Sequence, residues 1–325
     1  MAHGHDHPGH SHMPAGAGDG TILIAVIVNL GLTLAQVIGG YVADSTALIA
    51  DGVHNFSDAL ALVLAFGARR LARRPASPDM SFGWSRAEIV AAFVNYIALI
   101  AVSVWLAIEA FGRVFDPPEV QGGLVMALAG LALVIDLATA ALVWRAAQES
   151  VNIRAAFLHN LADAAVSIAV ILGGLLIWAF GWQIADPLLT VAISVVIMWH
   201  VGMEIGPVTR MLMLAAPAGI NHDEVDQSLH RIAGVTGVHH VHLWQIDEKR
   251  TALSAHLVME PGAIPSDLVR NAKTMLKAKF GIDHATIESE WLGEPCGDPQ
   301  HSDDHDHDHD HDHDHGHNHG HGNRH

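Results

Sequence analysis

Long apolar runs dominate the first two thirds of the chain. Six of them occupy residues 21–43, 45–68, 86–112, 121–145, 152–178 and 185–210, and charged residues, glycine or proline bound each one. A helix of about 20 apolar residues crosses the hydrocarbon core of a bilayer, which is roughly 30 Å thick. The pattern therefore predicts an α-helical membrane protein, with a six-transmembrane-helix bundle over residues 19–212.

The pattern changes after residue 216. Residues 222–232 and 266–280 have the spacing of surface helices, whereas 238–246, 253–260 and 286–291 read as strands, the first two by alternation. This α-β-β-α-β order predicts a small α/β domain over residues 216–293, in which helices cover a three-stranded sheet.

Both ends of the chain are low in complexity. Residues 1–18 place five histidines among glycine, proline and aspartate, and residues 294–325 run into a His-Asp and then a His-Gly repeat. Such segments have too few apolar residues to bury a core, so we expect two disordered tails. Histidine without fixed spacing is typical of many weak, exchangeable metal sites, although such a tail could also serve only to solvate the protein.

Composition fits this division. Half of the residues are hydrophobic, and seven of the acidic residues behind the net charge of −17 lie between Asp303 and Asp314. Nucleic-acid binding has no support, because basic patches are scarce and the tail is acidic. The single cysteine, Cys296, excludes an intramolecular disulfide and is consistent with a reducing compartment.

The arginines between apolar segments are unevenly distributed. Four of them, at positions 69, 70, 73 and 74, lie between the second and third segments, whereas Arg113 stands on the opposite side. Positively charged loops stay in the cytoplasm. We therefore expect both termini in the cytoplasm of a protein of the bacterial inner or plasma membrane.

Two of the apolar segments carry the same pair of polar residues. His54 and Asp58 lie in the second segment, and His159 and Asp163 lie in the fifth. Residues four apart share one face of a helix, so each segment offers a nitrogen and an oxygen to a common point. Ionisable groups in a membrane are costly unless they are paired or ligated, and two such helices side by side predict a four-ligand metal site. The alternative is a pair of His–Asp hydrogen bonds that only fasten the helices together.

These ligand types restrict the metal. Two histidines and two carboxylates suit tetrahedral Zn²⁺ without water. Imidazole disfavours Mg²⁺, Ca²⁺ and Mn²⁺, while the same four ligands accept Cd²⁺, Co²⁺ and Ni²⁺. Metal binding requires neutral histidine and ionised carboxylate, so loading would release protons and proton binding would release metal.

Two more carboxylates lie in apolar segments. Asp51 precedes His54 by three residues, and we interpret it as an interfacial residue, with a role as a metal ligand, behind the ligands or in proton relay as the alternative. Asp136 lies deep in the fourth segment without a partner in its own helix. We expect it to support the ligands or relay protons, unless it only forms a buried hydrogen bond with Asn29, Gln36 or Asn95.

Further motifs give the chain a family resemblance. The third segment, between the two His-x-x-x-Asp pairs, opens with Phe82-Gly83-Trp84-Ser85-Arg86-Ala87-Glu88. The sixth segment, after both pairs, opens with Asp186-Pro187. With the small α/β domain behind them, these features resemble the cation diffusion facilitator family in its zinc-type branch. The resemblance implies a homodimer that exports Zn²⁺ in exchange for protons, with the transport site at the ligands His54, Asp58, His159 and Asp163.

The resemblance also implies regulatory metal binding in the cytoplasmic domain, near a dimer interface. The matching positions are His239, His256 and Glu288, with Glu290 as a further candidate. Strand alternation places His240 on the face opposite His239, so not all histidines of this strand can join one site. The alternative is that these are ordinary exposed strand histidines.

Two other classes of protein remain open. A membrane metal sensor or store would suit the tails and the α/β domain, but it leaves a site inside the membrane without a purpose. An intramembrane metallohydrolase ranks last, since the chain has no His-Glu-x-x-His motif and four protein ligands leave no position for catalytic water. We therefore expect a transporter rather than an enzyme, with no organic cofactor.

Overall fold

The computed structural model describes residues 19–147 and 151–298. The tail expected at residues 1–18 lies outside these ranges, as does the part of the tail expected at 294–325 that follows residue 298. Six long helices come first, and they confirm the predicted bundle. They are α1 (Asp19–Ala43), α2 (Thr46–Ala72), α3 (Ala87–Phe115), α4 (Gly122–Ala147), α5 (Val151–Phe180) and α6 (Ala185–Leu212).

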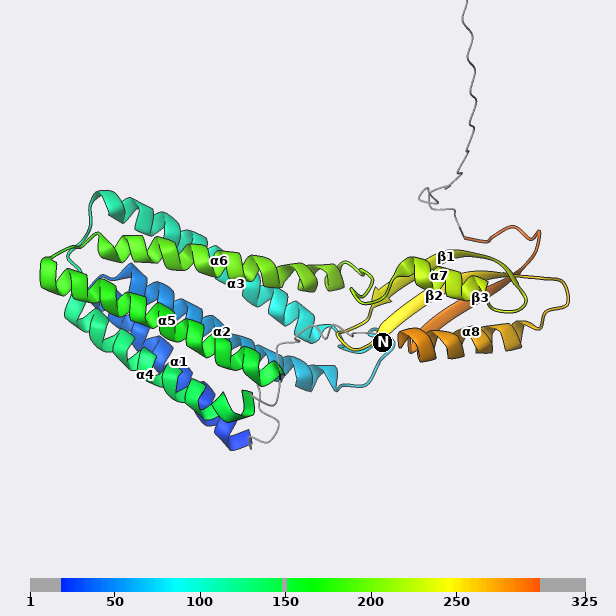
Figure 1. The fold of residues 1–325 in the computed structure, drawn as a ribbon, viewed down its shortest axis with the longest axis horizontal. Coiled ribbons are helices and arrows are strands. Elements are labelled where there is room, and N and C mark those ends of the chain that lie inside the picture. The colour runs from blue at the N-terminus through cyan, green and yellow to red at the C-terminus, as the bar shows by residue number, and fades with distance from the viewer. Residues whose placement is uncertain (1–18, 148–150, 299–325) are drawn as a thin grey trace, which may run out of the picture.

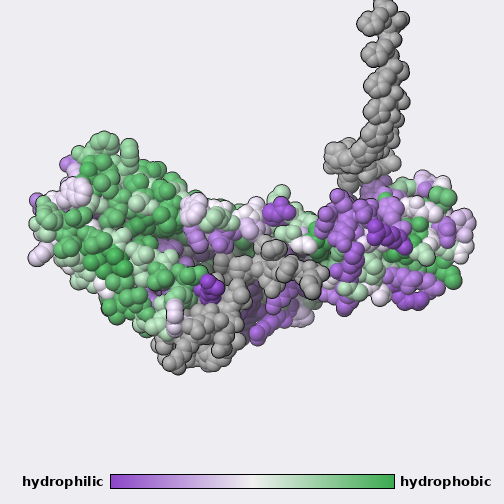
Figure 2. Space-filling model, viewed as in Figure 1, coloured by the Kyte–Doolittle hydropathy of each residue, from purple (hydrophilic) through white to green (hydrophobic). Residues whose placement is uncertain are grey.

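The surface of the bundle is that of a membrane protein. Five of the helices are long and apolar enough to cross a bilayer, and the described side chains of α1 add a shorter apolar stretch, Ile27–Ala43. Large hydrophobic side chains such as Phe66, Trp105 and Ile108 are mostly exposed. Figure 2 shows the hydrophobic surface concentrated on the helical part and the hydrophilic surface on the remainder. Exposed apolar area on this scale requires a nonaqueous surrounding.

The helices pack in pairs. α4 lies along α5, α3 along α6, and α1 along α2, while α2 also contacts α3, α5 and α6 (Figure 1). Close approach of α4 and α5 depends on small residues, because a Cβ added at Gly122 would lie 2.5 Å from the carbonyl oxygen of Gly174. Because α2 contacts α3, α5 and α6 as well as α1, the helix that carries the first His-x-x-x-Asp pair is central to the bundle.

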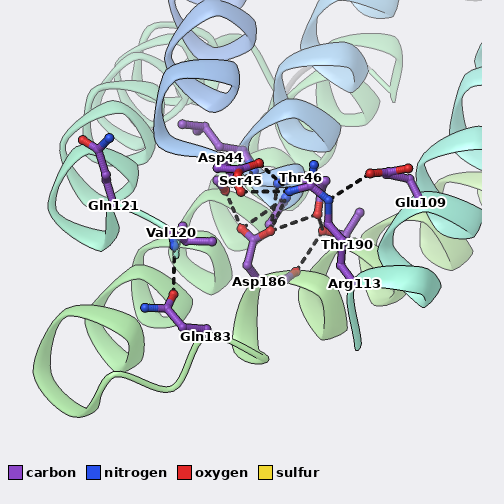
Figure 3. A network of polar contacts seen from close by, with 12 residues as sticks. Asp44, Ser45, Thr46, Glu109, Arg113, Val120, Gln121, Gln183, Asp186 and Thr190 are labelled. Carbon is purple, nitrogen blue, oxygen red and sulfur yellow. Dashed lines mark hydrogen bonds and ion pairs between the residues drawn. The ribbon is translucent and has the colours of Figure 1, made fainter. Parts of the chain in front are cut away.

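A polar network (Figure 3) joins the starts of α2 and α6, at the end of the bundle that is remote from the small domain in Figure 1. Asp186, in the first turn of α6, accepts hydrogen bonds from the backbone N–H of Thr46 at 2.8 Å, from its Oγ1 at 2.9 Å, and from the Ser45 hydroxyl. A carboxylate at a helix N-terminus satisfies unpaired N–H groups and complements the helix dipole. Arg113 of α3 adds an ion pair to Asp44 at 2.7 Å. The start of α2 is thus fastened to both α6 and α3.

The small domain has the predicted α-β-β-α-β order. Its elements are α7 (His222–His230), β1 (Val235–Gln245), β2 (Thr251–Met259), α8 (Pro265–Phe280) and β3 (His284–Trp291). The sheet order is β1-β2-β3, with β1 antiparallel and β3 parallel to β2. Leucines and valines of both helices pack on β2, whose residues Leu253 and Leu257 are fully buried. The parallel β2–β3 pair requires the α8 crossover, so this topology follows from the element order.

The loop-helix motif that opens α3 forms the joint between the two parts of the molecule. Arg86 donates to the carbonyl oxygens of Gln245 at 2.8 Å and Ile246 at 3.2 Å, at the turn between β1 and β2. Phe82 stacks edge-to-face on His284 at the start of β3, with 5.5 Å between ring centroids. The guanidinium fork suits two neighbouring carbonyls, so this motif docks the sheet onto the bundle.

Strand β1 departs from the alternation expected from its sequence. Its pairing with β2 shifts register between His239 and His242, and His240 has a positive φ of 50°. The rings of His239 and His240 both lie near His256, with centroids 5.3 and 5.1 Å away. The prediction that His240 points to the opposite face is therefore wrong, because a bulge reorients the side chains around it.

Candidate metal-transport site

The structure brings the two His-x-x-x-Asp pairs together as one ring of four side chains. His54 Nε2 lies 3.2 Å from Asp163 Oδ1, and His159 Nε2 lies 3.2 Å from Asp58 Oδ2. Within each helix, the corresponding distances are 3.8 Å for His54 to Asp58 and 3.5 Å for His159 to Asp163. Each imidazole nitrogen therefore faces both carboxylates, and neither pair is self-contained.

These distances suit a tetrahedral ion. Ligands placed about 2.0 to 2.1 Å from a Zn²⁺ ion at tetrahedral angles are about 3.3 Å from one another. The four nitrogen-to-oxygen distances, 3.2 to 3.8 Å, are close to that separation. The ligand atoms of His54, Asp58 and Asp163 lie within 4.8 Å of one another. Small side-chain movements would be enough to enclose an ion.

Helix α2 positions its half of the site rigidly. Ser45 caps the helix by accepting a hydrogen bond from the N–H of Leu48 at 3.1 Å, and Asp186 satisfies further N–H groups of the first turn. His54 follows eight residues after the start of α2, which is about 12 Å along the axis. The network that fixes the start of α2 therefore also fixes where His54 and Asp58 lie.

The site is enclosed but reachable. The side chains of Asp163 and His54 are 10% and 14% exposed, whereas those of His159 and Asp58 are 26% and 31% exposed. His54 Nδ1 is shielded from solvent and has no hydrogen-bond partner among the described residues. The two better exposed side chains, His159 and Asp58, come from different helices.

Asp51 belongs to the protein interior and not to the water interface, which corrects the expectation from its place near the start of the segment. It is 1% exposed and accepts a hydrogen bond from Gln36 Nε2 at 2.5 Å. Gln36 Oε1 in turn accepts from Asn55 Nδ2 at 3.0 Å. Gln36 of α1 was considered from the sequence only as a partner of Asp136, and the structure shows it bonded to Asp51 instead. This chain of amides holds Asp51 behind His54.

Asp136 also lies behind the ligands. It is 9% exposed, and Ser167 of α5 donates to its Oδ2 at 3.4 Å. None of the three partners considered from the sequence bonds to it in the described structure; Asn95, for example, donates to Ser57 at 3.0 Å. Asp136 interacts electrostatically with Asp163, His159 and His54. One additional carboxylate therefore stands on α2 and another on α4, next to the ring of four.

The cytoplasmic candidates come together in a different combination from the expected one. His256 Nδ1 lies 2.8 Å from Glu290 Oε1, and His239 Nε2 lies 3.1 Å from Glu290 Oε2. Glu288 is mostly exposed and reaches only the other ring nitrogen of His256, at 3.7 Å. Cys296, which the sequence did not single out as a ligand, joins His239, His256 and Glu290 within 4.8 Å. Glu290 therefore takes the central place expected of Glu288.

The charge state of Glu290 fits this position. Burial raises its pKa, but hydrogen bonds from His256 and Cys296 and the nearby charge of His239 outweigh burial, so that the pKa lies below its usual range. Two histidines on adjacent strands thus face an ionised carboxylate, as a cation site requires.

The family models divide the chain at the boundary between the two structural parts. The model described as the cation efflux transmembrane domain matches residues 22–213, and the model for the cytoplasmic domain of cation efflux proteins matches residues 217–290. With the paired-helix site and the six-helix fold, these matches define a transporter of metal cations rather than an enzyme. The chain belongs to the cation diffusion facilitator family, in its zinc-type branch.

Individual relatives agree with this assignment. The chain is 34% identical to the zinc transporter ZitB of Escherichia coli over 301 residues, which cover 92% of this chain and 95% of the relative. It is also 34% identical to a cadmium, cobalt and zinc/H⁺-K⁺ antiporter of Bacillus velezensis, covering 89% and 92%. A solved metal-bound C-terminal domain of the CzcD transporter is 30% identical, matches 22% of this chain and 99% of that structure, and has a TM-score of 0.21. The chain is thus a metal cation efflux protein embedded in a membrane.

Proposed function

We propose that this protein is a Zn²⁺/H⁺ antiporter that exports zinc from the cytoplasm. The observation that carries the proposal is the ring of His54, Asp58, His159 and Asp163, in which the Nε2 atom of each histidine lies within 3.8 Å of both carboxylates. Four protein ligands at this spacing would strip the ion of water. The names of relatives that transport zinc support the same cargo.

Proton exchange follows from the ligands. A histidine binds metal only when its ring is neutral, and a carboxylate only when it is ionised. In the ring each histidine would instead share a proton with a carboxylate on the other helix, at 3.2 Å in both pairs. Zinc and these shared protons compete for the same atoms, so arrival of one favours departure of the other. His54 and His159 are the proposed proton carriers, with Asp51 and Asp136 as the nearest reservoir.

Alternating access would act across the helix pairs. The ring lies between α2 and α5, whereas α3 and α6 form a separate pair that α2 also contacts. We propose that movement of the α3–α6 pair against the other four helices opens the ring first to the cytoplasm and then to the outside. Arginines 69, 70, 73 and 74 end α2 near the α/β domain, which supports a cytoplasmic location for this domain and both termini.

We further propose that the protein acts as a homodimer and that the α/β domain binds regulatory metal. The match of residues 217–290 to the cytoplasmic domain of cation efflux proteins supports both. The cluster of histidine and glutamate on β1, β2 and β3 supplies candidate ligands. A transporter of the same class that prefers Cd²⁺, Co²⁺ or Ni²⁺ is the second candidate, because one relative is named for cadmium and cobalt as well as zinc.

The test is transport by the purified protein in sealed vesicles that contain a pH dye. Zn²⁺, Cd²⁺, Co²⁺, Ni²⁺ and Mn²⁺ are added in turn, and metal uptake and internal pH are followed together. We expect uptake of Zn²⁺ with proton flux in the opposite direction, no response to Mn²⁺, and loss of both signals in Asp163→Ala. Tight zinc binding without flux in the wild type would instead indicate a sensor or store.

A further inference from the structure

The single cysteine of the chain lies in the segment that follows β3, between the sheet and the histidine-rich tail. Its sulfur is 3.5 Å from His256 Nδ1, and Glu290 also accepts a hydrogen bond from it. Three residues of the sheet face the thiol from three different strands: His239 on β1, His256 on β2 and Glu290 on β3. A thiol, two imidazoles and a carboxylate thus converge from four separate stretches of the chain.

We propose that Cys296 supplies a thiolate ligand to the metal site that the family resemblance implies in this domain, so that a soft divalent cation, Zn²⁺ or Cd²⁺, is bound by His239, His256, Glu290 and Cys296 of one chain. The four ligand atoms lie within 4.8 Å of one another, and the set has the number and type of ligands that tetrahedral zinc takes. Thiolate favours Zn²⁺ and Cd²⁺ over harder ions. The proposal deepens the regulatory site suggested above and rests on the proposed function only for the supply of metal.

The surroundings of His256 support this arrangement. A metal-binding histidine usually coordinates through one ring nitrogen and donates the N–H of the other to a carboxylate, which fixes the ring. His256 Nδ1 faces the thiol and Glu290, while its Nε2 lies 3.3 Å from Asp298 Oδ2 and 3.7 Å from Glu288 Oε2. The carboxylates on the Nε2 side would accept the remaining ring proton.

His239 gives an independent indication. Its Nε2 is shielded from solvent and makes no hydrogen bond with any described residue, although Glu290 Oε2 lies only 3.1 Å away. The contact has the distance of an ion pair without hydrogen-bond alignment. A buried ring nitrogen without an aligned partner is costly, and a metal ion shared with Glu290 would satisfy both groups.

The site would have a mechanical consequence. Cys296 lies five residues after the end of β3 and five before the His-Asp repeat begins at His301. A metal ion on Cys296 would hold this connecting segment against the sheet. Loading of the site would therefore determine where the tail leaves the domain.

The experiment uses the fact that the chain has one thiol. Co²⁺ is added to the full-length reduced protein, and the near-ultraviolet thiolate-to-cobalt charge-transfer band is recorded. Histidine and carboxylate ligands of the transport site and tails give no such band, so the signal reports Cys296 alone. We expect the band in the wild type, its complete loss in Cys296→Ser, and its displacement by added Zn²⁺ or Cd²⁺.

Substitutions on β1 and β3, including a matched pair of glutamates on β3, identify the partners. We expect Glu290→Gln and His239→Ala each to raise the Co²⁺ concentration for half-maximal band by more than about 10-fold, and Glu288→Gln to change it by less than about 3-fold. Two results would overturn the proposal: cobalt binding without the band while the thiol remains reduced, or a band unaffected by Glu290→Gln and His239→Ala. The second would mean that the tail supplies the other ligands.

This test is separate from that of transport. Asp163→Ala removes a ligand of the membrane ring and is expected to keep the cobalt–thiolate band unchanged. Zinc flux in vesicles is followed in the wild type and in Asp163→Ala, and neither signal depends on the cobalt–thiolate band. A band without flux would contradict the transport function alone, and flux without a band would contradict the thiolate site alone.

Discussion

The membrane ring and the cytoplasmic cluster use similar side chains but are built in different ways. The ring consists of two identical His-x-x-x-Asp pairs, each on one turn of a straight helix. The cluster draws one residue from each of three strands and a fourth from the segment after the sheet. A helix fixes ligand geometry by spacing in the sequence, whereas a sheet fixes it by register and bulges. We infer that the ring is rigid enough for a transport cycle and that the cluster adapts to metal.

The largest difference between the two sites is expected when one carboxylate is removed from each. Asp58→Asn keeps the shape of the side chain but removes a charged ligand, and we expect zinc flux in vesicles to fall by more than about 100-fold, which corresponds to about 3 kcal/mol. Glu290→Gln makes the same chemical change in the cytoplasmic cluster and is expected to leave flux at saturating zinc within about 3-fold. Equal losses in the two variants would contradict the separation of transport from regulation.

The rigidity of the ring can be tested at Asp186. Asp186→Asn retains shape but loses the charge that holds the start of α2, and we expect the free energy of unfolding to fall by about 2 kcal/mol. The decrease would be measured as a lower midpoint of thermal unfolding in detergent, together with slower zinc flux. Asp116→Asn alters an exposed aspartate after α3 and serves as the control. An unchanged midpoint for Asp186→Asn would show that the network does not stabilise α2.

The joint between the two regions depends on Arg86. Arg86→Ala removes two hydrogen bonds to carbonyls of the β1–β2 turn, worth about 1 kcal/mol, and we expect a protease that does not cut at arginine to cleave the segment at 213–221 about 5-fold faster. Arg70→Ala, at an exposed position near the end of α2, is expected to leave the rate unchanged. Equal cleavage of both variants and the wild type would mean that the domains are held by other contacts.

The smallest effect is expected from the C-terminal tail. Deleting residues 301–325 should leave zinc flux at saturating metal within about 2-fold, because weak exchangeable sites do not set the turnover of the ring. At low zinc concentration the truncated protein should require more metal for half-maximal flux. Complete loss of turnover would contradict a buffering role for the tail.

The comparison also explains how much could be predicted from sequence. Apolar runs of membrane length and the i, i+4 spacing were sufficient for the six helices and for the ring of His54, Asp58, His159 and Asp163. Residues four apart on a helix share one face, so the spacing alone places the histidine and the aspartate of each pair side by side. The element order of the α/β domain was equally readable, because each strand and helix has its own periodicity.

The cytoplasmic cluster could not be predicted in the same way. A register shift after His239 turns His240 toward His256. The alternation of polar and apolar residues in the sequence does not indicate where such a bulge occurs. Glu288 and Glu290 share one face of β3, so only the tertiary position of His256 distinguishes them. One feature of the sequence could have indicated Cys296 as a ligand: it is the sole thiol, and it lies between the last strand and a histidine-rich tail.

Whether the membrane ring binds zinc through its four side chains is tested by X-ray absorption at the zinc edge. The variant used lacks residues 1–18 and 299–325 and carries His256→Ala and Cys296→Ser. These changes leave the membrane ring as the remaining proposed zinc site. The account predicts one zinc per chain with four nitrogen or oxygen ligands at about 2.0 Å, lost in Asp163→Asn. Six-coordinate zinc, or zinc that remains bound in Asp163→Asn, would contradict it.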